Sequence, residues 1–194
     1  MSLFEYLAIA FSLVYSLAAL RLLGGLPSAM APGRRSFLHL TSTLVMLALV
    51  AISFWTFWSL RDVEWTYPGF MVALLVPGGL YYCAAVLIPE NPESIESWHD
   101  HYFAIRRRLY VGFGGWALAA ATSATVNLGM GIVHPARGVH ALALVVGLVG
   151  AASAKERVHR GLVIVLAGLM IAASFAQLGP GWLAGGGGVA STTP

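Results

Sequence analysis

The chain alternates long apolar runs with short clusters of proline, glycine and charged residues. Six runs are each close to the roughly 20 residues that a helix needs to cross the hydrocarbon core of a bilayer. Backbone polar groups in lipid must be bonded within their own segment, which favours helices. No run shows the alternating polarity of a β-barrel strand. The pattern predicts helices at residues 4–23, 37–60, 67–88, 108–131, 138–154 and 161–183.

Composition strengthens this interpretation. Hydrophobic residues make up 58% of the 194 positions and charged residues only 10%, with a mean hydropathy of +0.78. A soluble domain carries roughly 25% charged residues, so a soluble enzyme and a nucleic-acid-binding protein are excluded. The predicted fold is an all-α, polytopic membrane bundle of six transmembrane helices, with one domain over residues 1–183 and a flexible tail over 184–194.

The basic residues predict the orientation of the bundle. Counted at alternate helix ends, nine of the 11 basic residues fall on one side and two on the other. The positive-inside rule therefore places both termini outside the cytoplasm. The nine are Arg21, Arg34, Arg35, Arg106, Arg107, Arg108, Lys155, Arg157 and Arg160, and the two are Arg61 and Arg137.

The longest connection, residues 89–108, has a helical pattern of its own. Asn91 is a suitable N-cap before Pro92, and acidic residues follow where the helix dipole favours them. An apolar face opposes an acidic face, so an amphipathic interfacial helix is expected over 92–107 on the inner membrane surface. A partner-binding surface is the alternative. The apolar face includes Ile95, Trp98 and Tyr102, and the acidic face includes Glu93, Glu96 and Asp100.

The third apolar run contains Pro77, Gly78 and Gly79 near its midpoint. Proline removes a backbone donor, and a broken helix at the midplane is a pointer to a binding site in transporters. A plain kink is the alternative. No charged residue occupies the middle third of any span, so coupling to an ion gradient is not expected. Residues that could line a path with this break are Ser12, Tyr15, Ser16, Tyr81, Tyr82, Thr122 and Ser123.

Histidines and acids offer weak metal candidates and no predicted cofactor. Glu96 and His99 have the spacing of one Glu-x-x-His half-site, but a di-iron centre requires two such motifs. His134 and His140 belong to the side opposite the basic loops, where they form either a cation- or pH-sensing group or a wet surface. Small residues are expected to allow close helix packing, namely Gly112, Gly114, Gly115, Ala119, Gly147 and Gly150.

Several short motifs resemble those of a widespread family of small six-helix bacterial membrane proteins that has no established activity. The resemblance implies the topology and a bacterial inner membrane. It departs from the family at Arg108, where an aromatic residue is frequent. The shared motifs are Phe4-Glu5-Tyr6, Trp55 and Trp58 before Trp65-Thr66, Pro77 with Tyr81, His101-Tyr102-Phe103 before Arg106-Arg107, and Lys155-Glu156-Arg157 with His159.

Two functional classes remain open. The first is a passive channel or facilitator for a small neutral solute, with a path beside Pro77. The second is a non-transporting sensor or accessory subunit that acts through the cytoplasmic 89–108 segment. An enzyme is not favoured, because the acidic run lacks a nucleophile or a second motif. The expected partners are the lipid bilayer and either further copies of the chain or a larger membrane complex.

Overall fold

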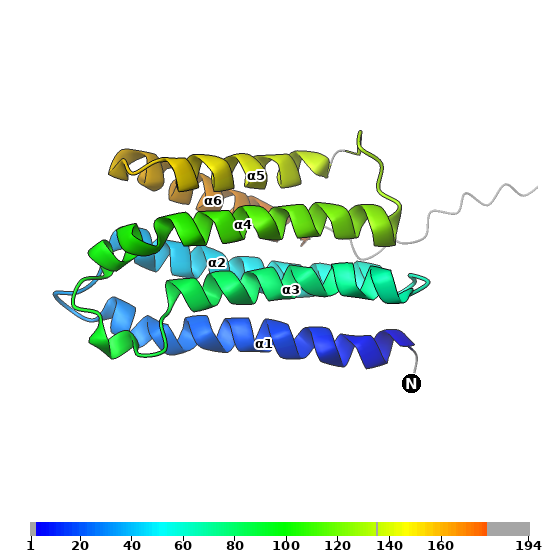
Figure 1. Cartoon of the computed structure of the whole chain (residues 1–194), viewed down its shortest axis with the longest axis horizontal. Helices are drawn as coiled ribbons and strands as arrows, with labels where there is room; N and C mark the ends of the chain where they lie inside the picture. Colours follow the sequence, from blue (N-terminus) through cyan, green and yellow to red (C-terminus); the bar gives the residue numbers. More distant parts are fainter. Residues whose placement is uncertain (1–2, 135, 178–194) are drawn as a thin grey trace, which may run out of the picture.

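The computed structural model describes residues 3–134 and 136–177, and these residues form an all-helical bundle without strands. The predicted tail over 184–194 and the end of the last predicted span lie outside the described residues. Figure 1 shows α1, α3, α4 and α5 stacked in one layer, with α2 and α6 behind it. The helices are α1 (Leu3–Met30), α2 (Phe37–Thr56), α3 (Tyr67–Leu87), α4 (Trp98–Leu128), α5 (Arg137–Ala152) and α6 (Glu156–Gln177), with short 3-10 helices η1 (Phe57–Leu60) and η2 (Pro92–Ser94).

Among the described residues, four helical segments are long and apolar enough to cross a membrane. They span Leu3–Met30, Phe37–Leu60, Tyr67–Ser94 and Trp98–Leu128, with mean hydropathies between 1.2 and 2.1. Helix α5 is apolar but has only 16 residues. The prediction of an all-α fold with apolar, membrane-compatible helices is therefore confirmed, at the level of four such segments.

Consecutive helices run in opposite directions, so their connections gather at two ends (Figure 1). Connections 31–36, 88–97 and 153–155 share one end, and connections 57–66 and 129–134 share the other. The basic loops predicted from the sequence all lie at the first end, which we call the basic end. The two sets of basic residues counted along the sequence therefore lie toward opposite ends of the bundle.

Side-chain caps explain where three helices begin. The hydroxyl of Ser36 accepts from the backbone of His39, and the hydroxyl of Thr66 accepts from Gly69 at 3.2 Å. Ser97 caps α4 by accepting from the backbone N–H of Asp100 at 3.3 Å. Such caps satisfy amide groups that have no partner within the helix.

The separate interfacial helix expected over 92–107 was a wrong prediction. Asn91 makes no side-chain cap, η2 ends at Ser94, and the next helix is α4, which begins at Trp98 and continues into the bundle. Ile95 is half-buried, and Trp98 and Tyr102 are fully buried, so the apolar face packs against the bundle, one of the two orientations open to it, while the acidic face is exposed as expected. The polar atoms of Trp98 and Tyr102 find partners inside the bundle, which removes the reason for an interfacial position.

The predicted close packing is confirmed for most of the small residues. A Cβ atom at Gly147 would lie 3.0 Å from the Cα atom of Gly114, so α4 and α5 approach backbone to backbone. Gly112 packs on Tyr82, and Gly150 packs on the ring of Tyr110. Gly115 is the exception, because a Cβ atom there would meet nothing within 4 Å.

Candidate functional site

The predicted break in the third helix is not observed. Helix α3 is uninterrupted from Tyr67 to Leu87, with Pro77 buried inside it. Proline removes one intrahelical hydrogen bond, but neighbouring turns keep the helical path. Gly79 sits against α4, since a Cβ atom there would lie 3.1 Å from the Cβ atom of Trp116, and Gly78 faces open space. The middle of α3 is therefore a packing surface against α4.

The other predicted path residues are not brought together by the fold. Ser12 lines a groove with Phe4 and Trp58 at the end opposite the basic end. Tyr15 and Ser16 line a second groove, between α1 and α2. Each of these grooves is distinct from the one that contains Tyr81, described below.

The remaining polar side chains on α4 also lie apart from that path. Thr122 is exposed, lines a groove between α4 and α5, and donates to the carbonyl of Leu118 in its own helix at 2.9 Å. Ser123 is buried and accepts from the side chain of Asn127 at 3.1 Å. Tyr82 is 47% exposed and packs on Gly112. These residues were grouped because they fall at similar depths in their predicted spans, but depth along a helix does not indicate the direction in which a side chain points.

Buried polar and aromatic side chains instead meet at the basic end. The Nε2 atom of His39 lies 3.0 Å from the carbonyl oxygen of Leu87, and Nε2 of His101 lies 3.3 Å from the same oxygen. The ring of Trp98 lies 4.2 Å from that of His39 between centroids. A carbonyl only accepts, so both imidazoles donate from Nε2. The end of α3 is thereby bound to α2 and α4.

A second group of buried side chains joins α4 to α6. The Tyr102 hydroxyl lies 3.0 Å from the Tyr110 hydroxyl and 3.1 Å from Nδ1 of His159. The Nε2 atom of His159 lies 3.0 Å from the carbonyl oxygen of Ser153. In neutral His159, Nε2 must donate to this carbonyl and Nδ1 must accept. Tyr102 therefore donates to His159 and accepts from Tyr110. We call Tyr110, Tyr102, His159 and the Ser153 carbonyl the tyrosine–histidine chain.

This chain has two chemical capacities. It satisfies four buried polar groups, which stabilises the junction of α4 and α6 in a low-dielectric interior. Its two hydroxyls also donate and accept in sequence, so the Ser153 carbonyl at one end fixes the direction of every hydrogen bond in the chain.

The connection between α3 and α4 is held in place by a further set of hydrogen bonds. Arg34 donates to the carbonyl of Glu93 at 2.9 Å, to the carbonyl of Ile95 at 3.1 Å and to the Glu93 carboxylate at 3.1 Å. Ser28 donates to the carbonyl of Pro92 at 2.9 Å, and its own carbonyl accepts from the Trp98 indole at 3.0 Å. We call residues 88–97 the acidic connection, because Glu90, Glu93 and Glu96 are exposed on it.

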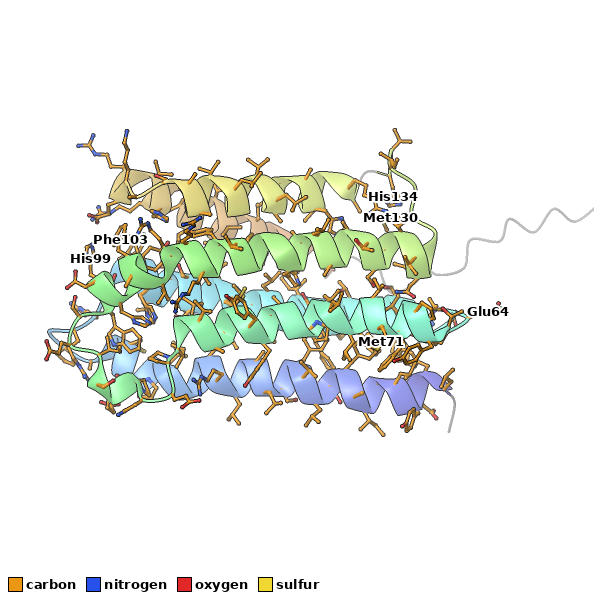
Figure 2. The ribbon with its side chains drawn as sticks, in the orientation of Figure 1. Glu64, Met71, His99, Phe103, Met130 and His134 are labelled. Atoms are coloured by element: carbon orange, nitrogen blue, oxygen red, sulfur yellow. The ribbon has the colours of Figure 1, made fainter. Side chains whose placement is uncertain are left out.

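The metal candidates do not assemble. Within residues 3–134 and 136–177, no three histidine, cysteine or acidic side chains are placed to hold a metal ion. Figure 2 shows His99 at one end of the bundle and His134 at the other. His99 lies 3.4 Å from Asp100 and 3.8 Å from Glu156, and His140 lies in the groove between α4 and α5.

Surface charges near this end pair locally. The Glu156 carboxylate accepts two hydrogen bonds from Arg160, at 3.0 and 2.6 Å. These bonds, and the positive charge beside them, hold the pKa of Glu156 below its usual range. Both side chains are substantially exposed, so this ion pair contributes little to stability.

Sequence reasoning missed the tyrosine–histidine chain as a group. Its side chains come from α4 and α6, and no local spacing connects Tyr102 with His159. The available signal was the set of histidines and tyrosines that fall at the basic end of several helices.

Comparisons of the chain with protein-family models, curated proteins and solved structures find no match.

Proposed function

We propose that this chain is a non-transporting accessory or sensor subunit of a bacterial inner membrane. All six helices cross the bilayer, both termini lie on the periplasmic side, and the basic end faces the cytoplasm. The acidic connection is the surface through which the protein acts, either on further copies of itself or on another subunit of a membrane complex.

The outward surfaces of the helices support a lipid environment. Large apolar side chains are exposed along α1, where Leu13 is 61% and Leu20 is 66% exposed, and along α5, where Leu148 is 71% exposed. Soluble monomers rarely expose contiguous apolar surface on this scale. The opposed charge counts at the two ends support the orientation.

Close packing at the level of Pro77 favours the non-transporting alternative over the facilitator. Gly79 lies against Trp116, and Gly112 lies against Tyr82 and Cys83, which is fully buried. These contacts fill the space between α3 and α4 where the solute path was expected. A path there would require the two helices to separate.

The fixed geometry of the acidic connection is the observation that carries this proposal. A short loop of exposed acids would ordinarily be free to move, and ordering it on binding would oppose association. Here Arg34 and Ser28 hold the backbone at three carbonyl groups. The Glu93 carboxylate is already paired with Arg34, whereas the exposed Glu96 is carried on a backbone held in one arrangement, which suits a partner with basic side chains.

Site-specific photocrosslinking in cells tests this surface. A photoreactive residue at position 96 is expected to give an adduct of one discrete mass, whereas the same residue at Leu148 is expected to react with lipid. Arg34→Gln should lower the yield at position 96 several-fold, because it releases the connection. Arg35→Gln is the matched control. Equal yields from positions 96 and 148, or no adduct at 96, would reject the proposal.

Solute flux separates the two alternatives directly. Proteoliposomes are expected to swell in glycerol or urea no faster than empty liposomes. Swelling that is faster with the protein, and that Pro77→Ala with Gly78→Leu abolishes, would instead establish the facilitator.

A further inference from the structure

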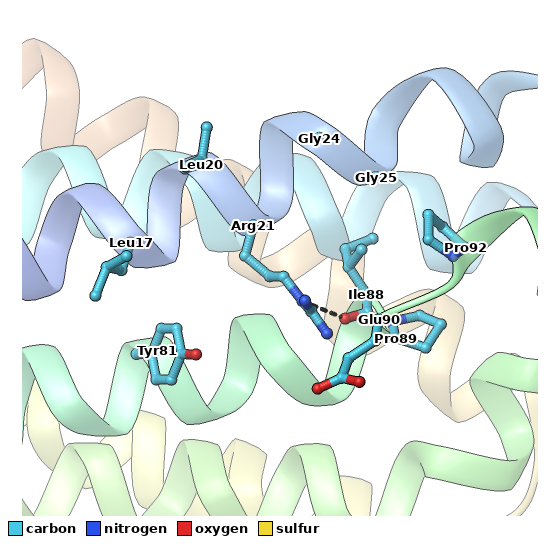
Figure 3. A pocket seen from close by; sticks show the side chains of 10 residues that line it. All are labelled: Leu17, Leu20, Arg21, Gly24, Gly25, Tyr81, Ile88, Pro89, Glu90 and Pro92. Carbon is cyan, nitrogen blue, oxygen red and sulfur yellow. Dashed lines mark hydrogen bonds between the residues drawn. The ribbon is translucent and has the colours of Figure 1, made fainter.

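A groove on the side of the bundle lies between α1 and the end of α3, where the acidic connection begins (Figure 3). We call it the lateral groove. It has a volume of about 370 Å³ and is open to the surroundings of the bundle. Its wall changes from apolar to charged along its length. The residues that define this change are Leu17, Leu20, Tyr81, Ile88, Arg21 and Glu90.

The position of Arg21 along α1 matches the edge of a bilayer core. Glu5 and Arg21 are separated by about 24 Å of helix at the standard rise per residue. No charged residue lies between them. A hydrocarbon core is about 30 Å thick, and long cationic side chains reach toward its edge. With Glu5 near one surface, Arg21 lies just inside the opposite edge of the core, from which its long side chain extends toward the phosphate level.

Arg21 is held so that its terminal nitrogens face the groove. Its Nε atom donates to the carbonyl oxygen of Ile88 at 2.8 Å, which fixes the guanidinium at the end of α3 (Figure 3). Among the described residues, its two terminal nitrogens have no hydrogen-bond partner. A half-buried guanidinium with free donors at this depth suits a phosphate group, which it can bind in a bidentate manner.

Glu90 supplies an opposite charge further along the same groove. Its carboxylate is exposed, and the described part of the chain contains no ion pair between Glu90 and Arg21. The two charges are thus available to different parts of one ligand. On the other side of Arg21, Leu17 and Leu20 are 44% and 66% exposed and offer apolar contact.

We propose that the lateral groove binds a phospholipid whose headgroup carries a phosphate followed by a primary ammonium and no carboxylate, which Glu90 would repel; this is phosphatidylethanolamine. Arg21 binds the phosphate, Glu90 accepts hydrogen bonds from the ammonium, and Leu17, Leu20 and Tyr81 contact the upper acyl chain. A choline headgroup has no N–H to donate to Glu90, and a glycerol headgroup brings no positive charge. The order of apolar, basic and acidic groups along the groove therefore selects the ethanolamine headgroup.

This inference rests on the membrane location of the chain and not on its action as a subunit. The test measures lipids retained by the isolated protein, so it is independent of any partner. The full-length protein in mild detergent is mixed with equal amounts of phosphatidylethanolamine, phosphatidylcholine and phosphatidylglycerol of identical chains. Native mass spectrometry then counts the lipids that remain bound.

The wild-type protein is expected to retain phosphatidylethanolamine about tenfold more than phosphatidylcholine, the ratio typical of one charge-assisted hydrogen bond. Glu90→Gln should bring these two lipids to equal retention. Arg21→Gln should lower retention of all three. Glu96→Gln and Arg157→Gln change exposed charges at the same end, outside the groove, and should leave the pattern unchanged.

Because Arg21→Gln could lower lipid retention by destabilising the fold, a second variant fills the groove and leaves Arg21 in place. Gly24 lines the groove, and a Cβ atom there meets nothing within 4 Å, so Gly24→Leu should occupy the groove without a clash and abolish the preference. Equal retention of phosphatidylethanolamine and phosphatidylcholine by the wild-type protein would overturn the proposal. Tighter retention of phosphatidylglycerol, or an unchanged pattern in both Arg21→Gln and Gly24→Leu, would also overturn it.

Discussion

The hydroxyl group of Tyr102 lies 3.1 Å from Nδ1 of His159, on two helices that are far apart in the sequence. The Ser153 carbonyl fixes the direction of this bond, because it requires neutral His159 to donate from Nε2. Tyr102 is consequently the central member of the tyrosine–histidine chain. It donates to one partner and accepts from the other.

Tyr102→Phe is expected to destabilise the protein more than Tyr110→Phe. The first substitution leaves Nδ1 of His159 buried without a donor and also removes the acceptor of Tyr110, at a cost of about 2–3 kcal/mol. The second removes only a donor to Tyr102, which costs about 1 kcal/mol. Unfolding by sodium dodecyl sulfate in lipid–detergent bicelles measures both values.

The double variant provides the control for this chain. Because Tyr102 contacts Tyr110 directly, the two effects should not add, and Tyr102→Phe with Tyr110→Phe should resemble Tyr102→Phe alone. Additive losses, or a larger loss in Tyr110→Phe, would contradict the central position of Tyr102 in the chain.

A glycine contact between α4 and α5 gives a second prediction. Gly147→Ala should destabilise the bundle by about 1–3 kcal/mol, because its Cβ atom would lie 3.0 Å from the backbone of Gly114 and Tyr110. Gly115→Ala is the matched control. It meets open space and should be neutral or stabilising by up to about 1 kcal/mol through helix propensity. The same unfolding assay applies, and equal effects would refute the close approach of α4 and α5 at Gly147.

The six α-helices of the described residues followed from the sequence, because apolar runs of bilayer length have few alternatives to helix, whereas the separate helix expected over 92–107 is not observed. The bounds of three helices also differ from those predicted, and α6 begins at Glu156 instead of residue 161. Arg21 suggested the end of the first helix, but its guanidinium binds the Ile88 carbonyl, and α1 continues to Met30. Arg106 suggested the start of the fourth, yet it donates to the carbonyl of Ser153 at 3.3 Å within a helix that begins at Trp98.

The candidate site was less accessible to sequence reasoning. The contact of His39 with the Leu87 carbonyl joins residues far apart in sequence, and it involves a backbone atom that no residue type reveals. Pro77 suggested a broken helix by its chemistry, but α3 continues through it, and Gly79 of the same helix packs against Trp116. Local patterns therefore predicted the elements, while the pairing of their polar side chains depended on the tertiary arrangement.

Cysteine accessibility provides the third prediction, which concerns orientation. In a Cys83→Ala background, Glu64→Cys and Val133→Cys should react with an impermeant maleimide in intact spheroplasts. Arg35→Cys and Glu96→Cys should react only after the membrane is permeabilised. All four positions lie outside the buried core, the first two at the end opposite the basic end, so differences report the membrane side. The reverse labelling pattern would invert the proposed topology.

Arg137 gives the last prediction, since it is one of only two basic residues opposite the basic end and yet has a structural role. Its guanidinium donates to the carbonyl of Ala121 at 2.6 Å, to the Thr125 hydroxyl at 2.6 Å and to the carbonyl of Gly131 at 3.3 Å. It also donates to the carbonyl of Met130. Met130 and Gly131 lie in the connection directly after α4, whereas Ala121 and Thr125 belong to its last turns, so Arg137 ties this connection back to the helix.

Arg137→Gln should therefore lower the free energy of unfolding by about 2–4 kcal/mol, because four hydrogen bonds between α5, α4 and the connection after α4 are lost at once. Arg137→Lys should recover only part of this loss, since a single ammonium cannot reach acceptors arranged around a planar guanidinium. Arg61→Gln is the matched control. Arg61 pairs with its exposed neighbour Asp62 at 3.1 Å, and its replacement should change stability by no more than about 0.5 kcal/mol. Full recovery of the free energy of unfolding in Arg137→Lys would show that Arg137 acts through its charge alone. Equal losses of stability in Arg137→Gln and Arg61→Gln would contradict a structural role of Arg137 at the end of α4.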